Sequence, residues 1–285
     1  MDHPFDYGSV KELVQLAAGG KISDVVLGCQ AHEDEVEPQA VLERMQGMLD
    51  VMRESVKDGM QPGMRSNSGM VGGQAYQLSQ AVAEGKTVSD SFLGRMEAMA
   101  LSVAECNACM GRIVAAPTAG SCGILPGSLF SCQEKYGYGD AQLVRALLTA
   151  AGIGRIIAEK ASISGAEGGC QAECGTAAAM AAAAMVELRG GSPEDCAAAV
   201  SLTLMNMMGL VCDPMGGLVE VPCVYRNVAG VVNAVAAADM ALSGIRPPLD
   251  CDDVIETMGQ VGRMIPESLR ETGLGGCAAC KSCSK

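Results

Sequence analysis

Apolar positions recur with the period of an α-helix along most of the chain. Residues 39–57 follow a proline and place apolar side chains on one face, at Val41, Leu42, Met45, Met48, Leu49 and Met52. Further helices are predicted over residues 87–106, 140–160, 176–188, 228–242 and 252–264. No segment shows the sustained apolar–polar alternation with β-branched residues that is typical of a strand. The pattern therefore predicts an all-α fold, organised as a single helical domain over residues 1–285.

Capping residues mark two of the helix starts. Ser9 and Glu12 have the spacing of a capping box, and the pair Gly19-Gly20 is expected to end the helix that follows. Ser192 precedes Pro193, which suits an N-cap residue followed by the first helical position. We expect this second helix to extend to about residue 208.

Four irregular segments rich in glycine, proline, serine and cysteine separate the predicted helices. They cover residues 64–73, 115–127, 162–175 and 212–227. Loops held by a rigid scaffold are where binding and catalytic groups tend to lie. We therefore expect the functional residues in these segments.

Composition narrows the class of protein. Apolar residues make up 49% and charged residues 19%, as in globular proteins, while aromatics are only 3%. Alanine, methionine and leucine must therefore fill the core, which favours close helix packing. The net charge of −13 argues against nucleic acid and anionic membrane surfaces as partners.

Neither a leader nor a membrane span is indicated, so we expect a cytoplasmic protein. The first residues lack the basic and apolar regions of a secretory signal. The most apolar stretches, residues 177–186 and 228–240, fall short of the roughly 18 residues of a membrane span.

The chain has fourteen cysteines, which such a protein would keep reduced. We expect Cys29, Cys132, Cys196 and Cys251 to be small buried apolar side chains. The surplus of thiols nevertheless raises the possibility of a metal or cluster site.

Cys170 lies in a glycine-rich segment, residues 162–175, that leads into an alanine-rich helix. A thiolate at a helix N-terminus is stabilised by unpaired N–H groups and the helix dipole, so Cys170 is a candidate metal ligand. A flexible glycine loop with a buried cysteine is the alternative.

Cys212 and Cys223 flank a turn rich in proline and glycine, and each lies near a proline. Such a turn can hold two thiolates at fixed positions, as ligation of a cluster requires. Their spacing is too wide for a zinc knuckle.

Together these segments resemble the alpha chain of the iron–sulfur L-serine dehydratases. The similar stretches are Gly-Ala-Glu-Gly-Gly-Cys-Gln-Ala-Glu-Cys-Gly at 165–175 and Cys-Asp-Pro-Met-Gly-Gly-Leu-Val-Glu-Val-Pro-Cys at 212–223, together with residues 65–73 and 116–127. They occur in the family's order, and the resemblance covers about residues 57–276. It implies a lyase that dehydrates and deaminates L-serine to pyruvate and ammonia.

The resemblance also implies the cofactor. A [4Fe–4S] cluster would be held by Cys170, Cys212 and Cys223, and its fourth iron would stay open as a Lewis acid for the substrate. Cys174, about one helical turn from Cys170, is expected to be a buried helix residue and no ligand. No pyridoxal phosphate is expected, because Lys160, the lysine nearest to a motif, more plausibly ends a helix.

The other two motifs would then bind L-serine. Their backbone N–H groups and hydroxyls could hold a carboxylate, and the alternative is a pair of tight, capped turns. The candidate substrate-binding residues are Ser66, Ser68, Gly69, Thr118, Gly120, Ser121 and Gly123.

The general base is not identified by the motifs. The only histidines, His3 and His32, lie far from them in sequence, so the weak candidates are Glu167 and Glu173. Members of the resembled family either fuse a second domain or pair with a beta chain. Since this chain shows no such segment, we expect a separate beta subunit and an oligomer.

The C-terminus departs from the resembled family. Cys277, Cys280 and Cys283 have a ferredoxin-like spacing, but no fourth cysteine follows and the end of the chain is prone to fraying. We expect a disordered tail over residues 277–285, with a tail thiolate that closes the open iron as the alternative.

Two other kinds of protein stay open at this point. One is a non-catalytic iron–sulfur or zinc protein, and the other is an interaction subunit whose cysteines only pack. Within the enzyme interpretation, threonine or cysteine could replace serine as the substrate.

Overall fold

The structure is a computed structural model that describes residues 5–284, so His3 lies outside the described residues. Its α-helices are α1 (Val10–Leu16), α2 (Ile22–Glu33), α3 (Pro38–Gly59), α4 (Gln74–Ala83), α5 (Ser91–Ala108), α6 (Ile124–Tyr136), α7 (Asp140–Lys160), α8 (Gly165–Gly168), α9 (Thr176–Leu188), α10 (Pro193–Met207), α11 (Cys223–Leu242) and α12 (Cys251–Met264). Over the described residues no β-strand forms, and an isolated bridge joins Cys212 to Arg270. The predicted all-α class is confirmed.

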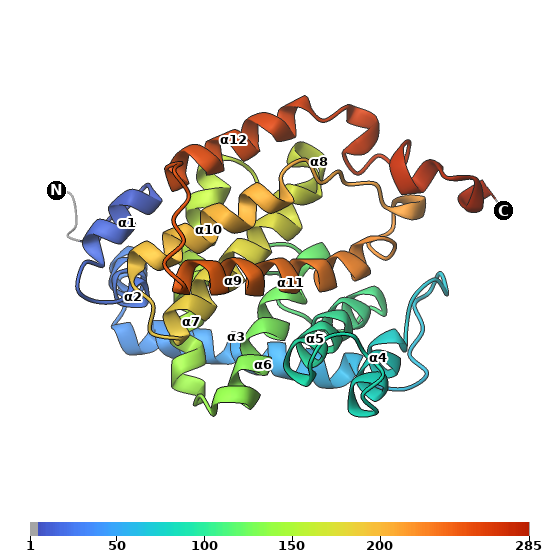
Figure 1. The fold of residues 1–285 in the computed structure, drawn as a ribbon, viewed down its shortest axis with the longest axis horizontal. Coiled ribbons are helices and arrows are strands. Elements are labelled where there is room, and N and C mark those ends of the chain that lie inside the picture. The colour runs from blue at the N-terminus through green and yellow to red at the C-terminus, as the bar shows by residue number, and fades with distance from the viewer. Residues whose placement is uncertain (1–4, 285) are drawn as a thin grey trace.

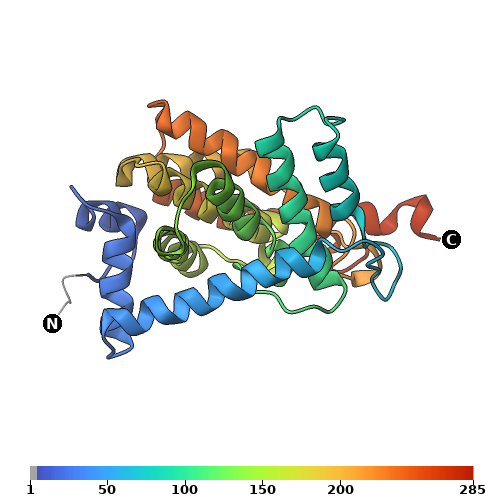
Figure 2. The same cartoon turned by 90° about the horizontal axis from the view of Figure 1, so that it is seen from below.

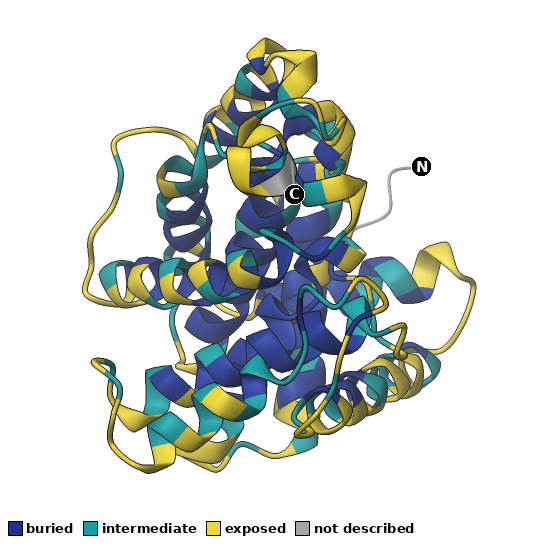
Figure 3. Cartoon of the chain, turned by 90° about the vertical axis from the view of Figure 1, so that its right-hand side faces the viewer, coloured by how far each residue is buried: buried dark blue, intermediate teal, exposed yellow. Residues whose placement is uncertain are grey.

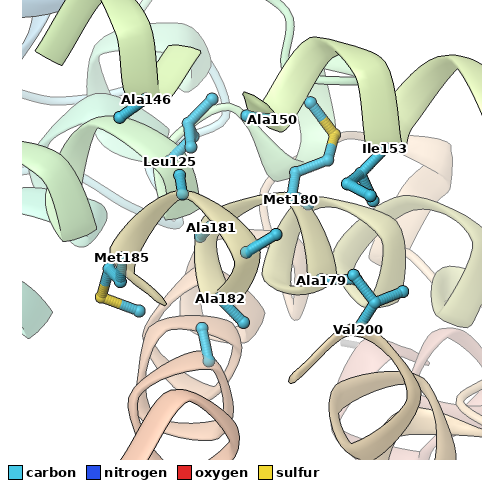
Figure 4. Close-up of a cluster of buried hydrophobic side chains, with 14 of the residues drawn as sticks. Leu125, Ala146, Ala150, Ile153, Ala179, Met180, Ala181, Ala182, Met185 and Val200 are labelled. Atoms are coloured by element: carbon cyan, nitrogen blue, oxygen red, sulfur yellow. The ribbon is translucent and has the colours of Figure 1, made fainter. Parts of the chain in front are cut away.

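Helix α9 forms the centre of the molecule, and α6, α7, α10 and α11 pack around it (Figure 1). Every side chain of α9 up to Glu187 is buried. Its alanines present little bulk, so the neighbouring helices approach closely. Methionines fill the remaining gaps, as Met180 and Met185 do beside Ala181 (Figure 4). The core is therefore built from small and flexible side chains, as the scarcity of aromatic residues predicts.

A second group of helices is organised by α5, which packs against α3, α4, α6 and α11. The long helix α3 runs beneath the core (Figure 2). Burial is concentrated along the central helices and falls off toward the surface loops (Figure 3). The two ends of the described chain lie at opposite sides of the molecule (Figure 1).

Several predicted boundaries agree with the structure. Helix α7 and helix α9 have the predicted bounds, and Lys160 ends α7. Ser192 caps α10, where its hydroxyl accepts a hydrogen bond from the Asp195 N–H and its own N–H donates to the Asp195 carboxylate. Strong capping signals thus located helix starts correctly.

Other elements differ from the sequence-based expectation. Helices α2, α4 and α6 were not predicted: α2 and α4 lack a side-chain cap, and α6 is buried at nine consecutive positions, Ile124–Cys132, so it shows no polar face. Helix α11 begins at Cys223 rather than at residue 228, and α5 begins at Ser91 rather than at residue 87.

Helix α7 is long and apolar enough to cross a membrane by length and composition, a property that the sequence analysis did not single out. However, 61% of its apolar window is buried inside the fold. Core helices of soluble proteins satisfy the same criterion, so this is weak evidence for a membrane span.

Candidate cysteine-rich active site

The first cysteine segment combines three unusual backbone elements. Helix α8 is a single turn, Gly169 follows it with φ of +75°, and a π-helical turn, η2 (Gln171–Gly175), leads into α9. Glycine suits the left-handed conformation at this point because it has no Cβ. Cys170 directly precedes the π-helical turn, whereas the sequence suggested a direct entry into α9. π-Helical turns inside helices are frequent at functional sites.

The second cysteine segment is held by the chain's C-terminal region. The Cys212 N–H donates to the Leu269 carbonyl at 2.9 Å, and the Glu271 N–H donates to the Cys212 carbonyl at 2.7 Å. Cys223 is the first residue of α11. Both cysteines therefore sit on backbone that is fixed by hydrogen bonds, one in an isolated bridge and one in a helix.

Cys170, Cys212 and Cys223 are all buried, with 2%, 2% and 5% of their surface exposed. Burial raises the pKa of the Cys223 thiol to about 12, and the charge of Cys170 adds to the shift. Burial also raises the pKa of Cys212, to which Glu173, Cys170 and Cys223 contribute. The three predicted thiols come from separate segments and lie near enough for their charges to act on one another.

The described thiols do not form a binding site for a single metal ion. Among the described residues, no group of three histidine, cysteine or acidic side chains is arranged to hold one metal ion. An iron–sulfur cluster binds its thiolates on different iron atoms, so it suits thiols that converge without meeting at one point.

Cys174 lies closer to the site than its place in the sequence suggested. Its Sγ is 3.4 Å from the Cys170 Sγ, and it is buried. This hydrogen bond lowers the pKa of Cys170 and, with burial, raises the pKa of Cys174 well above its usual value. Cys174 therefore acts as the donor to Cys170, while its exclusion as a ligand stays a prediction.

The two candidate acidic residues occupy different environments. Glu173 accepts a hydrogen bond from Thr118 Oγ1 at 2.8 Å, and its other oxygen lies 3.8 Å from Cys212 Sγ. Burial raises the pKa of Glu173, although the Thr118 hydrogen bond opposes the shift. Glu167, by contrast, is exposed and accepts from the Ser162 hydroxyl at 2.7 Å. Only Glu173 faces the thiols.

Space for this arrangement depends on Gly165. A Cβ at that position would lie 2.5 Å from Glu173 Oε2 and 2.9 Å from Cys212 Sγ. A larger residue would therefore displace the carboxylate or the thiol.

A half-buried cation, Arg226, also faces the thiols, and it was not predicted from the sequence. Arg226 donates to Asp213 at 2.6 Å and to the Val211 carbonyl at 2.7 Å, and its charge lowers the pKa of Cys170. The signal that could have revealed it is its spacing: Arg226 lies three residues after Cys223, hence on the same face of α11.

The predicted substrate loop at residues 116–127 contacts the site through Thr118, which also lies 3.1 Å from the Ser121 hydroxyl. The N–H of Gly123 is engaged by Asn227 Oδ1 at 2.9 Å, and Asn227 Nδ2 donates to the Gly120 carbonyl at 2.9 Å. Asn227, which the analysis of the sequence did not identify as functional, thus fixes the turn. In this structure the Thr118 hydroxyl, rather than the Gly123 N–H, is the group of this loop that contacts Glu173.

The other predicted loop is joined to the second cysteine segment. The hydroxyls of Ser66 and Ser68 both donate to Glu220 Oε2, at 2.6 and 2.5 Å, and the Gly69 N–H donates to the Ser66 carbonyl. Glu220 is buried and lies three residues before Cys223. An acidic residue in an otherwise apolar stretch is the feature of the sequence that could have identified Glu220.

Two remaining predictions concern residues at the ends of the chain. The N–H of Cys277 donates to Asp213 Oδ2 at 2.7 Å, which attaches the segment η5 (Gly276–Ala279) beside Cys212. The side chains of Cys277 and Cys280 are exposed, and the side chain of Cys283 lies outside the described ones. His32 lines a cavity of about 780 Å³ with Asp6, Glu33 and Arg155, away from every cysteine segment.

Known proteins resemble most of this chain in sequence. Residues 17–278 match the family described as serine dehydratase alpha chain. The chain belongs to this family. It is 46% identical to the probable L-serine dehydratase, alpha chain, of Bacillus subtilis (strain 168), over 96% of this chain and 91% of the relative.

Other family members show the same relationship. The L-serine dehydratase, alpha chain, of Peptoniphilus asaccharolyticus is 43% identical over 94% of this chain and 91% of its own. The L-serine dehydratase TdcG of Escherichia coli (strain K12) is 34% identical over 96% of this chain, which spans 62% of that longer relative. Both cysteine segments and both predicted substrate loops lie inside the region that matches the family.

Proposed function

We propose that the chain is the catalytic alpha chain of an L-serine dehydratase, which removes water from L-serine to give pyruvate and ammonia. The observation that carries this proposal is the convergence of three buried cysteines on Glu173 and Arg226 in a member of the serine dehydratase alpha-chain family. The alpha-chain relatives are named for L-serine dehydration.

The proposed cofactor is a [4Fe–4S] cluster held by Cys170, Cys212 and Cys223, without pyridoxal phosphate. The donor set fits such a group, because thiolates suit iron–sulfur clusters and the Arg226 cation offsets part of the negative charge. When bound, the cluster would supply Lewis acidity at an open iron, which assists departure of the substrate hydroxyl.

Glu173 is the proposed acceptor of the substrate Cα proton. Its carboxylate is half-buried and oriented by Thr118, so it keeps a defined direction beside Cys212. A carboxylate whose pKa is raised by burial is a stronger base than an exposed one. Loss of the proton and the hydroxyl leaves an aminoacrylate, which tautomerises and hydrolyses to pyruvate and ammonia.

Substrate binding is assigned to the two serine-containing loops. The Thr118 hydroxyl contacts Glu173, the Ser121 hydroxyl lies 3.1 Å from that of Thr118, and both can hydrogen-bond the substrate carboxylate. The turn that carries these two hydroxyls is held by Asn227, which hydrogen-bonds the Gly120 carbonyl and the Gly123 N–H. Ser66, Ser68 and Gly69 form the other loop, in which Ser66 and Ser68 donate hydrogen bonds to Glu220.

A separate beta chain is the proposed partner, within a larger oligomer in the cytoplasm. Two of the relatives carry the words alpha chain in their names, and the longer relative TdcG extends beyond the region shared with this chain. We propose that the partner closes the active site over the substrate.

The deciding experiment is anaerobic purification together with the partner chain, followed by iron and sulfide counting and an assay for pyruvate. We expect bound iron and pyruvate formation from L-serine, with slower product formation from L-threonine and L-cysteine. Protein without iron, or iron-loaded protein that forms no pyruvate, would overturn the proposal.

A further inference from the structure

A second cavity lies behind the first cysteine segment. It measures about 290 Å³ and is formed by α8, the π-helical turn η2, α12 and Arg270, which follows the turn η4 (Glu267–Leu269). Residues that line it include Glu167, Gly168, Gln171, Met258, Arg263 and Arg270. Neither Glu173 nor any of the cysteines lines this cavity, so it is distinct from the proposed active site.

The cavity carries an excess of positive charge in a chain of net charge −13. Two guanidinium groups, from Arg263 and Arg270, face one carboxylate, from Glu167. Arg263 Nη1 lies over Gly259, where an added Cβ would be only 3.5 Å away. An anion would therefore find two cationic groups on the cavity wall.

One of these groups, that of Arg270, makes only a weak hydrogen bond. Arg270 Nη1 makes a long contact of 3.4 Å with the Glu167 carbonyl, and Arg270 Nε is buried without any hydrogen-bond acceptor. Because Nε is excluded from solvent, an anion in the cavity would meet the Nη groups of Arg270 instead.

We infer that this cavity binds a small organic carboxylate. The guanidinium fork matches a carboxylate in a bidentate manner, and the volume suits a molecule of a few heavy atoms. The two sources of that chemistry near this enzyme are an α-amino acid and a 2-oxo acid. Glu167 could pair with the ammonium group of the former, so the two sources should differ in affinity.

The cavity is connected to both cysteine segments. Gln171 follows Cys170, and its side chain joins the Met258 carbonyl at 2.9 Å and the Gly209 N–H at 2.8 Å. The backbone of Arg270 pairs with that of Cys212. A bound carboxylate would thus contact residues that hold two of the proposed cluster ligands, which makes the cavity a regulatory site for the proposed function.

The test is site-specific binding, measured by NMR of arginine Nε–H groups in the anaerobically purified protein. Pyruvate and L-alanine serve as probes, since L-alanine has no hydroxyl to eliminate. The Arg270 signal is identified by its loss in Arg270→Gln. We expect it to move saturably with at least one probe, and Arg263→Gln should weaken that probe's binding by roughly tenfold or more.

Arg112→Gln is the matched control, because Arg112 is exposed and lies outside the cavity. The probe concentration at half-saturation should be the same for Arg112→Gln as for the wild type. Tighter binding of L-alanine would identify an amino-acid site, and tighter or equal binding of pyruvate a 2-oxo-acid site. An unmoved Arg270 signal with both probes, or the same midpoint in Arg263→Gln as in wild type, would overturn the inference. The choice of probes rests on the proposed function, but the readout needs no turnover, so the two can fail separately.

Discussion

Thr118 Oγ1 donates a hydrogen bond of 2.8 Å to Glu173 Oε1, and this contact ties the loop before α6 to the π-helical turn that follows Cys170. The same carboxylate reaches Cys212 Sγ with its other oxygen. A single half-buried side chain, that of Glu173, therefore links the predicted substrate loop to both cysteine segments, and its chemistry can be tested directly.

Glu173→Gln should lower the rate of pyruvate formation by roughly a hundredfold to ten-thousandfold, because it removes a general base without changing the shape of the side chain. Iron content should stay at the wild-type level. Glu54→Gln, on the exposed face of α3, is the control and should leave the rate unchanged. Loss of activity in Glu167→Gln with retention in Glu173→Gln would contradict the assignment.

Replacement of Cys170, Cys212 or Cys223 by serine should abolish both the absorbance of the cluster and the activity, since each thiolate is a proposed ligand. Cys174→Ser should keep both, because a serine hydroxyl can still donate to the Cys170 sulfur. Cys132→Ser, a buried change in α6, controls for general destabilisation. The ligand set is wrong if Cys174→Ser loses the cluster while Cys212→Ser retains it.

Air and chelators should inactivate the enzyme, because a cluster with three protein ligands leaves one iron exposed. Activity and iron content should fall together, and anaerobic incubation with iron and a thiol should restore both. The measurement is iron per chain against pyruvate formation over time. Full activity after prolonged exposure to air and chelator would exclude the open-iron proposal.

The isolated chain should bind its cluster yet form pyruvate slowly, and addition of the beta chain should restore turnover. The expected reason is that the partner closes the active site, which this chain alone leaves incomplete. Steady-state pyruvate formation by the iron-loaded chain, alone and then with its partner, measures the effect. Equal rates would show that the active site is complete within these 285 residues.

Glu105 provides a stability prediction away from the site. It accepts hydrogen bonds from the N–H groups of Gln74 and Ala75, at 2.9 and 3.2 Å, which start helix α4. Burial raises its pKa above the ordinary value of 4.5, although these N–H groups oppose the shift. The folded protein therefore binds this proton more tightly than the unfolded chain, and ionisation of Glu105 lowers stability as the pH rises above about 4.5.

Glu105→Gln removes this dependence. The Tm of the wild type minus that of the variant should therefore decrease as the pH is raised from about 4.5 to about 7, as measured by thermal unfolding of both proteins. Glu54→Gln, at an exposed position, should show no such trend. A difference that grows with pH would contradict the direction of the shift.

The sequence by itself determined the fold class, several helix bounds and the segments that carry the chemistry. These are local properties: Ser192 and Pro193 specify a helix start, and apolar periodicity specifies helix α3. Resemblance in four ordered motifs indicated the family, which the match over residues 17–278 confirmed. Helix α6 was not predicted because its residues 124–132 are buried on all sides, and such burial removes the apolar periodicity on which helix prediction depends.

Only the tertiary structure decided which of these residues meet. Glu167 and Glu173 are equally close to Cys170 in sequence, but the π-helical turn aims Glu173 at the thiols and leaves Glu167 on the surface. The contacts of Arg226 with Asp213 and of Glu220 with Ser66 join residues from different segments. Such pairings depend on how helices pack against one another, and no local pattern in the chain encodes that distance or direction.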